Sequence, residues 1–478
     1  MIYLIIVCVI FCACSKEVER STQRKVHQIK LTDFFPILKQ LQNEPKDVSN
    51  KNYSKPSEHQ INKQWDKTFG GNNWDELRAL QQTSDQGYIL GGSSYSPASF
   101  DKSDDSKGEK DFWIVKIDEN GNKQWDKTFG GSNWDELRSI QQTKDDGFFI
   151  GGTSLSDAFG DKSENSKGYW DFWVIKLDKN GNRQWDMTLG GNNKDWLTDS
   201  KQTSDGGYIL GGYSKSRASG DKSNDPRGAS DYWVIKIDGT GNRQWDSRFG
   251  GIGMDMLYSI QQTLDNGYIL GGVSHSGANG DKSDSSRGIS DFWIVKIDEY
   301  GKKQWDKTFG GDNEDELFSI QQTSDRGYIL GGFSKSSSNN DKTESAKGGY
   351  DFWAIKIDEN GNKQWDRTFG GSRYDKLSSI QQTSDSGYIM GGFSESPADG
   401  DKSENSLGWY DFWIVKIDKH GNKLWDKSFG GSEYDKLCSV QETLDGGYIL
   451  GGSSYSSTNK DKTDKSKGDN DYWIIKIK

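Results

Sequence analysis

The chain is poor in the residues on which disulfide scaffolds, metal sites and most catalytic centres depend. Its 478 residues include only six prolines, four histidines and four cysteines, and three of the cysteines lie within the first 14 positions. The fourth, Cys438, stands at a position that the other repeats described below fill with unrelated residues, which predicts a bystander thiol. HExxH, GxSxG, P-loop and CxxC patterns are absent as well. We predict a protein that is not an enzyme and that holds no metal ion and no cofactor.

Apolar residues are also scarce, at 31% of the chain, a level that is typical of disordered segments. Two abundant residue types favour a folded protein instead. Aromatic residues make up 13% of the sequence and each buries a large area, while the 58 glycines suit many tight turns. The net charge is −11, which is opposite to the basic surface that nucleic-acid binding requires. We expect an aromatic-cored β protein with no nucleic-acid partner.

The first residues predict export and a lipid anchor. Residues 1–13 form an apolar run that is shorter than the roughly 20 residues of a bilayer-spanning helix but typical of a signal-peptide core. The following Phe11-Cys12-Ala13-Cys14 resembles a bacterial lipobox, although Phe11 replaces the usual Leu and no Lys or Arg precedes the apolar run. We predict a lipoprotein-type signal peptide over residues 1–14, lipidation at Cys14 and a polar tether over residues 15–60. A plain signal peptide and a wrongly assigned start codon are the alternatives.

Two tryptophans recur with a period of 60 residues through the rest of the chain. A fixed period of this length indicates repeat architecture, and we predict that both sets pack between neighbouring repeats. The first set belongs to Trp-Asp pairs, at Trp65, Trp125, Trp185, Trp245, Trp305, Trp365 and Trp425. The second set is Trp113, Trp173, Trp233, Trp293, Trp353, Trp413 and Trp473.

One repeat predicts four short strands. Residues 111–118 are rich in β-branched and aromatic residues, and residues 123–129 alternate apolar and polar side chains. An Asn-Gly pair between these two segments is typical of a tight hairpin. Residues 137–143 and 148–153 form a second strand pair around a turn at 144–147, and a long loop then leads to the next repeat.

Four antiparallel strands repeated seven times predict an all-β, seven-bladed β-propeller over residues 61–478, built of four-stranded antiparallel blades. The repeat region begins on the returning-strand motif at 63–69 and ends on the first-strand motif at 471–477. The first and last repeats are therefore complementary fragments. A ring closed by the N-terminal strand of the repeat region accounts for this phase, whereas an open solenoid requires polar capping repeats.

The predicted ring has two unlike faces. Both tight hairpins of each blade point to one face, and the long loops share the other face with the Gly-Gly connections. The second face holds most of the positions at which the repeats differ, and aromatic residues are frequent there. Their flat apolar rings suit a sugar or a protein partner, while an equal alternative is that they cap the blade edges. The predicted ligand-binding residues are Trp74, Trp134, Trp170, Trp196, Tyr350, Tyr374, Trp409, Tyr410 and Tyr434.

Each long loop carries Asp-Lys followed by Ser or Thr, as at 101–103. Clustered oxygen atoms are typical of calcium sites, but the spacing differs from that of an EF-hand loop and the lysine opposes cation binding. We expect an Asp-anchored turn, with a calcium site as the alternative.

The block Asp-Gly-Gly-Tyr-Ile-Leu-Gly-Gly at 205–212 and 445–452, with the recurring Asp-Phe/Tyr-Trp and Gly-Asn-Lys-Gln-Trp-Asp motifs, resembles a family of bacterial envelope repeat proteins. This resemblance implies secreted or lipid-anchored, propeller-like proteins without an assigned activity. Asp118-Glu-Asn-Gly121 and Trp125 carry a weaker similarity to quinoprotein-like propellers, whose Thr-Gly-Lys turn is missing here, so quinone binding is not implied. The period also differs from the roughly 40–45 residues of WD40 repeats.

These patterns predict a non-catalytic protein that a lipid anchors in the bacterial cell envelope, at the outer membrane or the cell surface. We expect its propeller face to bind or scaffold an unidentified envelope protein or glycan. The alternatives are a glycan-binding lectin and, from another class, a propeller enzyme such as a hydrolase or a quinone-dependent dehydrogenase.

Overall fold

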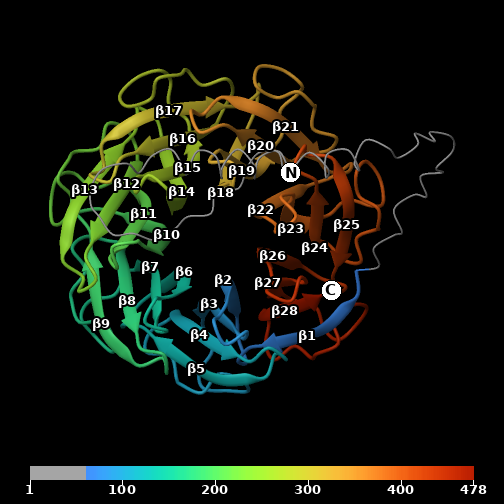
Figure 1. The fold of residues 1–478 in the computed structure, drawn as a ribbon. Helices are drawn as coiled ribbons and strands as arrows, with labels where there is room; N and C mark the ends of the chain where they lie inside the picture. The colour runs from blue at the N-terminus through green and yellow to red at the C-terminus, as the bar shows by residue number, and fades with distance from the viewer. Residues whose placement is uncertain (1–60) are drawn as a thin grey trace, which may run out of the picture. The chain divides into compact units, whose positions relative to one another are not determined.

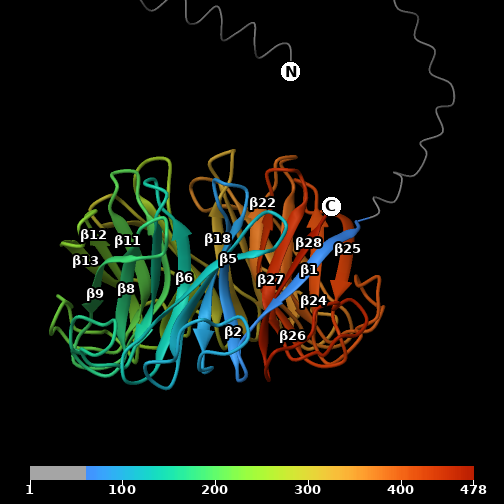
Figure 2. The ribbon, with the colours of Figure 1, turned by 90° about the horizontal axis from the view of Figure 1, so that it is seen from below.

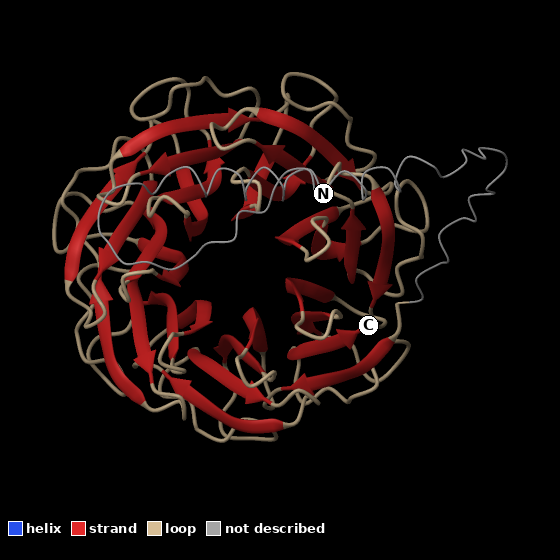
Figure 3. Ribbon diagram, in the orientation of Figure 1, coloured by secondary structure: helices blue, strands red, loops and turns tan. Residues whose placement is uncertain are grey.

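The computed structural model describes residues 61–478, which form 28 β-strands. The strands make seven four-stranded sheets, arranged as blades around one axis (Figure 1), and this confirms the predicted seven-bladed β-propeller. The rest of residues 61–478 consists of turns and loops (Figure 3), so this part of the chain has no helix that could cross a bilayer. The predicted lipidation at Cys14 and the predicted tether over 15–60 lie outside the described residues.

Each blade runs from an inner strand beside the axis to an outer strand at the circumference, and neighbouring strands are antiparallel. The inner strands are β2 (Asp75–Gln82), β6 (Asp135–Gln142), β10 (Asp195–Gln202), β14 (Asp255–Gln262), β18 (Asp315–Gln322), β22 (Asp375–Gln382) and β26 (Asp435–Glu442). The second strands are β3 (Tyr88–Ser94), β7 (Phe148–Ser154), β11 (Tyr208–Ser214), β15 (Tyr268–Ser274), β19 (Tyr328–Ser334), β23 (Tyr388–Ser394) and β27 (Tyr448–Ser454). The third strands are β4 (Asp111–Ile117), β8 (Asp171–Leu177), β12 (Asp231–Ile237), β16 (Asp291–Ile297), β20 (Asp351–Ile357), β24 (Asp411–Ile417) and β28 (Asp471–Ile477). The outer strands are β5 (Lys123–Phe129), β9 (Arg183–Leu189), β13 (Arg243–Phe249), β17 (Lys303–Phe309), β21 (Lys363–Phe369), β25 (Lys423–Phe429) and β1 (Lys63–Phe69).

Short hairpins join the inner to the second strand, and the third to the outer strand, of each blade. After β4, the Asp118 carboxylate accepts hydrogen bonds from the N–H groups of Asn120 and Asn122, at 2.9 and 2.8 Å, and Gly121 takes the positive φ of 80° that the turn needs. We call the side of the ring with these hairpins the hairpin face. The long connections between second and third strands, and the Gly-Gly connections between blades, lie on the opposite side, which we call the loop face (Figure 2).

The ring closes through a strand from the beginning of the propeller. β1 pairs with β28, which places Phe69 opposite Tyr472 and gives the last blade the order β1-β28-β27-β26 (Figure 1). The first and last blades are also joined at the hairpin face, where the Leu444 N–H donates to Gln82 Oε1 at 2.9 Å. The predicted closure by the N-terminal strand is confirmed.

Both sets of recurring tryptophans pack between blades, as predicted. The fully buried Trp113 lies 4.7 Å, between ring centroids, from Tyr472 of the preceding blade. Its indole N–H donates to the Asp126 carboxylate of its own blade at 3.1 Å. Trp125 meets Phe148 of the following blade edge-on, at 5.7 Å. Each Trp-Asp pair therefore contacts the next blade with its tryptophan and holds the other tryptophan in place with its aspartate.

Every inner strand contains a β-bulge, which the sequence pattern did not predict. In β2 the register with β3 shifts between Leu77 and Ala79, so that Arg78 has no opposite residue and its side chain is re-aimed. Opposite the bulge, a Cβ on Gly92 would lie 2.0 Å from the carbonyl oxygen of Glu76. The bulge therefore requires glycine in the second strand, and it sends the fourth side chain of each inner strand toward the axis.

Candidate functional site

The seven bulged side chains converge at the loop-face end of the central channel. They line a cavity of about 560 Å³, which we call the mouth cavity and whose size is that of ordinary small-molecule sites, about 300–1,000 Å³. Because these side chains differ from blade to blade, they give this cavity a chemistry that the repeat does not dictate. The bulged residues are Arg78, Arg138, Thr198, Tyr258, Phe318, Ser378 and Cys438.

Aromatic rings form the wall of the mouth cavity on the blades that contain β10, β14 and β18. Trp196 stacks on Tyr213 with a centroid separation of 5.0 Å and an interplanar angle of 28°. Tyr258, Phe318 and Phe333 form a second stack, with successive separations of 4.8 and 5.2 Å. Stacked rings hold each other in place and present a firm apolar wall.

Charged side chains form the wall on the blades that contain β2 and β6. Nη2 of Arg78 lies 2.9 Å from the Glu76 carboxylate, and Nη2 of Arg138 lies 2.8 Å from that of Glu136. Lys110 Nζ approaches Glu136 at 2.9 Å and Glu76 at 3.8 Å. Although burial opposes ionisation, Lys110 and Arg138 hold the pKa of Glu136 below its ordinary value. With three cations and two carboxylates, this cluster carries one surplus positive charge.

Further positive charge stands over aromatic rings around the channel mouth. The Lys376 ammonium lies 4.4 Å from the ring centroid of Phe333 and 4.3 Å from that of Tyr350, which is a cation–π geometry. Lys110 also stands over a ring, that of Tyr95. Four further lysines of the channel mouth do so, and within residues 61–478 neither they nor Lys376 have a carboxylate within ion-pair distance. These five lysines without an ion pair are Lys194, Lys215, Lys335, Lys376 and Lys436. The channel mouth is therefore locally basic on an acidic molecule.

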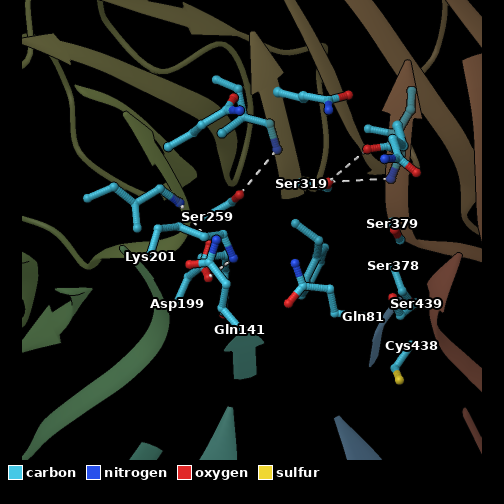
Figure 4. Close-up of a pocket in the computed structure, with 18 of the residues that line it drawn as sticks. Gln81, Gln141, Asp199, Lys201, Ser259, Ser319, Ser378, Ser379, Cys438 and Ser439 are labelled. Atoms are coloured by element: carbon cyan, nitrogen blue, oxygen red, sulfur yellow. Dashed lines mark hydrogen bonds and ion pairs between the residues drawn. The ribbon is translucent and has the colours of Figure 1, made fainter. Parts of the chain in front are cut away.

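The channel continues toward the hairpin face as a second cavity of about 680 Å³, which shares six of the seven bulged residues with the mouth cavity (Figure 4). Serine and glutamine recur around its wall, and Gln142 N–H donates to Gln81 Oε1 of the neighbouring blade at 2.7 Å. The blade of β10 differs, because Asp199 and Lys201 form an ion pair of 2.7 Å there. Most of this channel is polar and uncharged, which contrasts with the mouth cavity.

The nine predicted ligand-binding residues belong to the loop face or the channel mouth, but only Trp196 among them lines the mouth cavity. Tyr350 and Tyr410 stand behind its wall, edge-on to Phe333 at 5.1 Å and to Phe393 at 5.2 Å. The remaining six line neither of the two cavities and belong to the loop-face connections. They are Trp74, Trp134, Trp170, Tyr374, Trp409 and Tyr434.

Short parallel bridges between blades bring two of the variable positions together. The residue before a third strand pairs with the residue before the next inner strand, as Tyr410 does with Tyr434. Trp409, which is 60% exposed, lies parallel to Tyr434 at 5.9 Å and 13°. Tyr434 meets Tyr455 at 6.1 Å, and Tyr455 meets Trp74 at 5.4 Å. These contacts create a continuous run of aromatic rings on the rim of the loop face.

Most of the residues that line the mouth cavity are not among those predicted from the sequence. The residue at the position equivalent to Cys438 differs in almost every repeat, and this variation is the one feature of the sequence that marks the position as a candidate site. Hydrophobic periodicity does not reveal a β-bulge, however. Without the bulge, the side chains at this position would not be expected to point toward the axis.

The reactive residue types of the propeller are dispersed. Burial raises the pKa of the Cys438 thiol to about 12, so the thiol is protonated at neutral pH and is a poor nucleophile. His275 lies on the loop face with Nδ1 3.0 Å from the Ile289 carbonyl oxygen, whereas His420 belongs to a hairpin on the opposite face. Within residues 61–478 no three His, Cys, Asp or Glu side chains are grouped so that they could hold a metal ion.

The Asp-Lys-Ser loops are held by hydrogen bonds and a buried lysine. The Asp101 carboxylate accepts a hydrogen bond from the Gly70 N–H at 3.4 Å, and equivalent bonds in other blades are as short as 3.0 Å. The neighbouring Lys102 is buried, and its ammonium donates to the Asp104 carbonyl at 2.6 Å. This arrangement is the expected Asp-anchored turn.

No known protein family matches the sequence, and no curated protein does either. Solved structures with a similar fold include a protein of unknown function from Dyadobacter fermentans (9% identity, 87% of this chain and 99% of that chain covered, TM-score 0.44). Others are the Neurospora crassa Pan2 WD40 domain (9%, 84% and 89%, TM-score 0.43) and a europium-containing methanol dehydrogenase (8%, 87% and 93%, TM-score 0.36). At these identities and TM-scores the similarities carry no inference about activity or ligand.

Proposed function

We propose that the protein is a non-catalytic, lipid-anchored binding protein of the bacterial cell envelope, whose loop face binds or scaffolds an envelope protein or a glycan. The observation that carries this proposal is the contrast between the uniform blade core and the variable channel mouth. Every blade packs through the same tryptophans and aspartates, so the fold does not account for six residue types at the seven bulges. Different side chains around one cavity and its rim are what recognition of an asymmetric ligand requires.

The anchor and the location rest on residues 11–14, which resemble a lipobox. A catalytic role has less support, because the Cys438 thiol is protonated and the two propeller histidines lie on opposite faces. A lectin is the second candidate, and the exposed, parallel rings of Trp409 and Tyr434 favour it.

Capture of partners from envelope fractions tests the binding role. The bait is the purified full chain, and captured proteins and glycans are both identified. The loop-face variant combines Trp74→Ala, Trp134→Ala and Trp409→Ala, and the control combines Leu264→Ala, Tyr300→Ala and Leu444→Ala, which remove exposed apolar side chains from the hairpin face. Because aromatic anchors dominate recognition, we expect the loop-face variant to lose its partner by about tenfold or more while the control retains it. Equal capture by all three proteins would contradict the proposal.

A further inference from the structure

We propose that the mouth cavity and the adjoining rim bind an acidic glycan, with the carboxylate of a hexuronate residue held in the mouth cavity. This inference rests on the proposed binding role of the loop face and assigns that face a ligand class.

The cation cluster supplies the site for the carboxylate. Arg78 and Arg138 both line the mouth cavity, and each directs Nη2 to a glutamate. A guanidinium has five N–H donors in a planar fork, so each arginine retains donors for a ligand. Arginine forks bind carboxylates through paired, charge-assisted hydrogen bonds. One bound carboxylate would also neutralise the surplus positive charge of this half-buried cluster.

The aromatic wall suits a pyranose ring beside that carboxylate. A pyranose has an apolar face of C–H groups and an edge of hydroxyl groups. The ring pair Trp196 and Tyr213 offers apolar surface, while the Thr198 and Ser378 hydroxyls and the Glu316 carboxylate line the same cavity. An apolar wall with a few polar groups is the usual composition of a site that orients one small ligand.

A path of rings leads from the mouth cavity to the rim. Phe393 lines the cavity and lies 5.2 Å from Tyr410, which lies 5.5 Å from Tyr434, and Tyr434 is 5.9 Å from Trp409. Successive rings at such intervals offer a stacking surface to each residue of an extended glycan.

A lysine accompanies this path. The exposed Lys436 ammonium stands 5.8 Å from the Phe393 centroid and 5.5 and 5.9 Å from those of Tyr410 and Tyr434. Lys376 adds a cation where the path leaves the cavity. Aromatic rings accompanied by these two lysines, which have no ion pair within residues 61–478, match a chain whose sugars carry carboxylates. The molecule as a whole is acidic, so the cations at the channel mouth provide a local attraction for a polyanion.

Calorimetric titration of the full chain with short oligogalacturonates and oligomannuronates tests the inference. The control ligands are the same oligosaccharides, with their carboxyl groups reduced to alcohols. We expect the acidic forms to bind at least about tenfold more tightly, which corresponds to about 1.4 kcal/mol, and to lose affinity as salt is added.

Two matched double variants locate the site. Lys376→Gln with Lys436→Gln removes two cations that have no ion pair within residues 61–478, so the variant breaks no salt bridge of the propeller. Lys179→Gln with Lys419→Gln removes the same charge from exposed positions of the hairpin face. The first variant should lose about tenfold in affinity and the second should bind like wild type, with unchanged melting curves for both.

Several results would overturn the inference. They are equal binding of acidic and reduced oligosaccharides, equal loss in both lysine variants, binding of oligoglutamate but not of any saccharide, and no binding at all. If the loop-face variant still loses a partner captured from envelopes, only the ligand class is wrong. If neither experiment depends on the loop face, the proposed function fails as well.

Discussion

Two fully buried aspartates meet at the interfaces between blades. Between β20 and β22, the backbone N–H of Asp375 donates to the Tyr350 carbonyl at 2.6 Å, which brings Asp375 beside Asp351. Within residues 61–478 the Oδ1 atoms of both aspartates have no hydrogen-bond partner. Burial, reinforced by the charge of Asp375, raises the pKa of Asp351 to about 7, while Lys342 and Lys347 oppose that rise. Such a pair is most stable when one member carries a proton.

Asp351→Asn tests this interpretation through the pH dependence of stability. The folded-state pKa of about 7 lies above the value of about 3.9 in an unfolded chain, so the folded state holds the proton more tightly. The contribution of the protonated Asp351 carboxyl to the free energy of unfolding is complete below about pH 4 and is lost as the pH rises through about 7. Asparagine is uncharged throughout, so we expect the variant to be more stable than wild type at pH 8, by about 1.4 kcal/mol or more, and nearly equal to it below about pH 4.

Asp366→Asn in the same blade is the control for that measurement. Burial raises the pKa of Asp366, but hydrogen bonds from Lys363, Thr343 and Trp353 outweigh this effect and hold the pKa below its ordinary value. This group therefore contributes stability above the unfolded pKa, and its replacement should destabilise the protein at pH 8. If both variants respond to pH in the same direction, the shared-proton interpretation of Asp351 is wrong.

At the scale of the element, the β-bulge connects the core to the candidate site. The bulge in β18 sends Phe318 into the mouth cavity, and the neighbouring second strand accommodates it with Gly332. A Cβ on Gly332 would lie 2.0 Å from the Glu316 carbonyl oxygen. This oxygen belongs to the backbone, so the clash cannot be relieved by rotation of a side chain. The Gly-Gly pairs of the second strands are therefore needed both for blade packing and for the shape of the cavity.

Gly332→Ala should destabilise the propeller by about 1–3 kcal/mol, because the added methyl group displaces the bulged backbone. Denaturant unfolding measures this effect. Gly277→Ala is the matched control, since a Cβ there meets only the flexible Asn279 side chain at 3.4 Å. Equal stability of the two variants would show that the bulge yields freely and that glycine is not required opposite it.

At the scale of the whole molecule, the ring is closed by one strand and by a hydrogen-bonded belt. On the hairpin face, a backbone N–H in the turn after each inner strand donates a hydrogen bond to the next blade. The acceptor is a side-chain oxygen of the last residue of that blade's inner strand. The seven donors are Ser84, Lys144, Ser204, Leu264, Ser324, Ser384 and Leu444. The closing strand β1 contacts both blades at the junction as well, because it pairs with β28 and its Trp65 meets Tyr88 of the first blade edge-on at 6.1 Å.

Deletion of residues 61–70 removes β1 and leaves β28 with an unpaired edge. We expect the melting temperature to fall by roughly 10 °C or more, because an edge strand and its buried Phe69 are lost together. Deletion of residues 51–60 removes the same length of chain from the predicted tether and should leave the melting temperature unchanged. An identical melting curve after both deletions is the result that would contradict closure by β1.

The sequence alone determined the number of blades, the order of their strands and the way the ring closes. Strand periodicity and turn residues such as Gly121 act locally, and the exact repeat copies them seven times. The sequence also indicated that the loop face, where Trp409 and Tyr434 lie, is the variable one. Only the tertiary structure decided that Arg78 and Phe318 share a cavity and that Asp351 faces Asp375. The physical reason is that these residues are far apart in the chain, and they meet only because bulges turn them inward and the closed ring brings separate blades together.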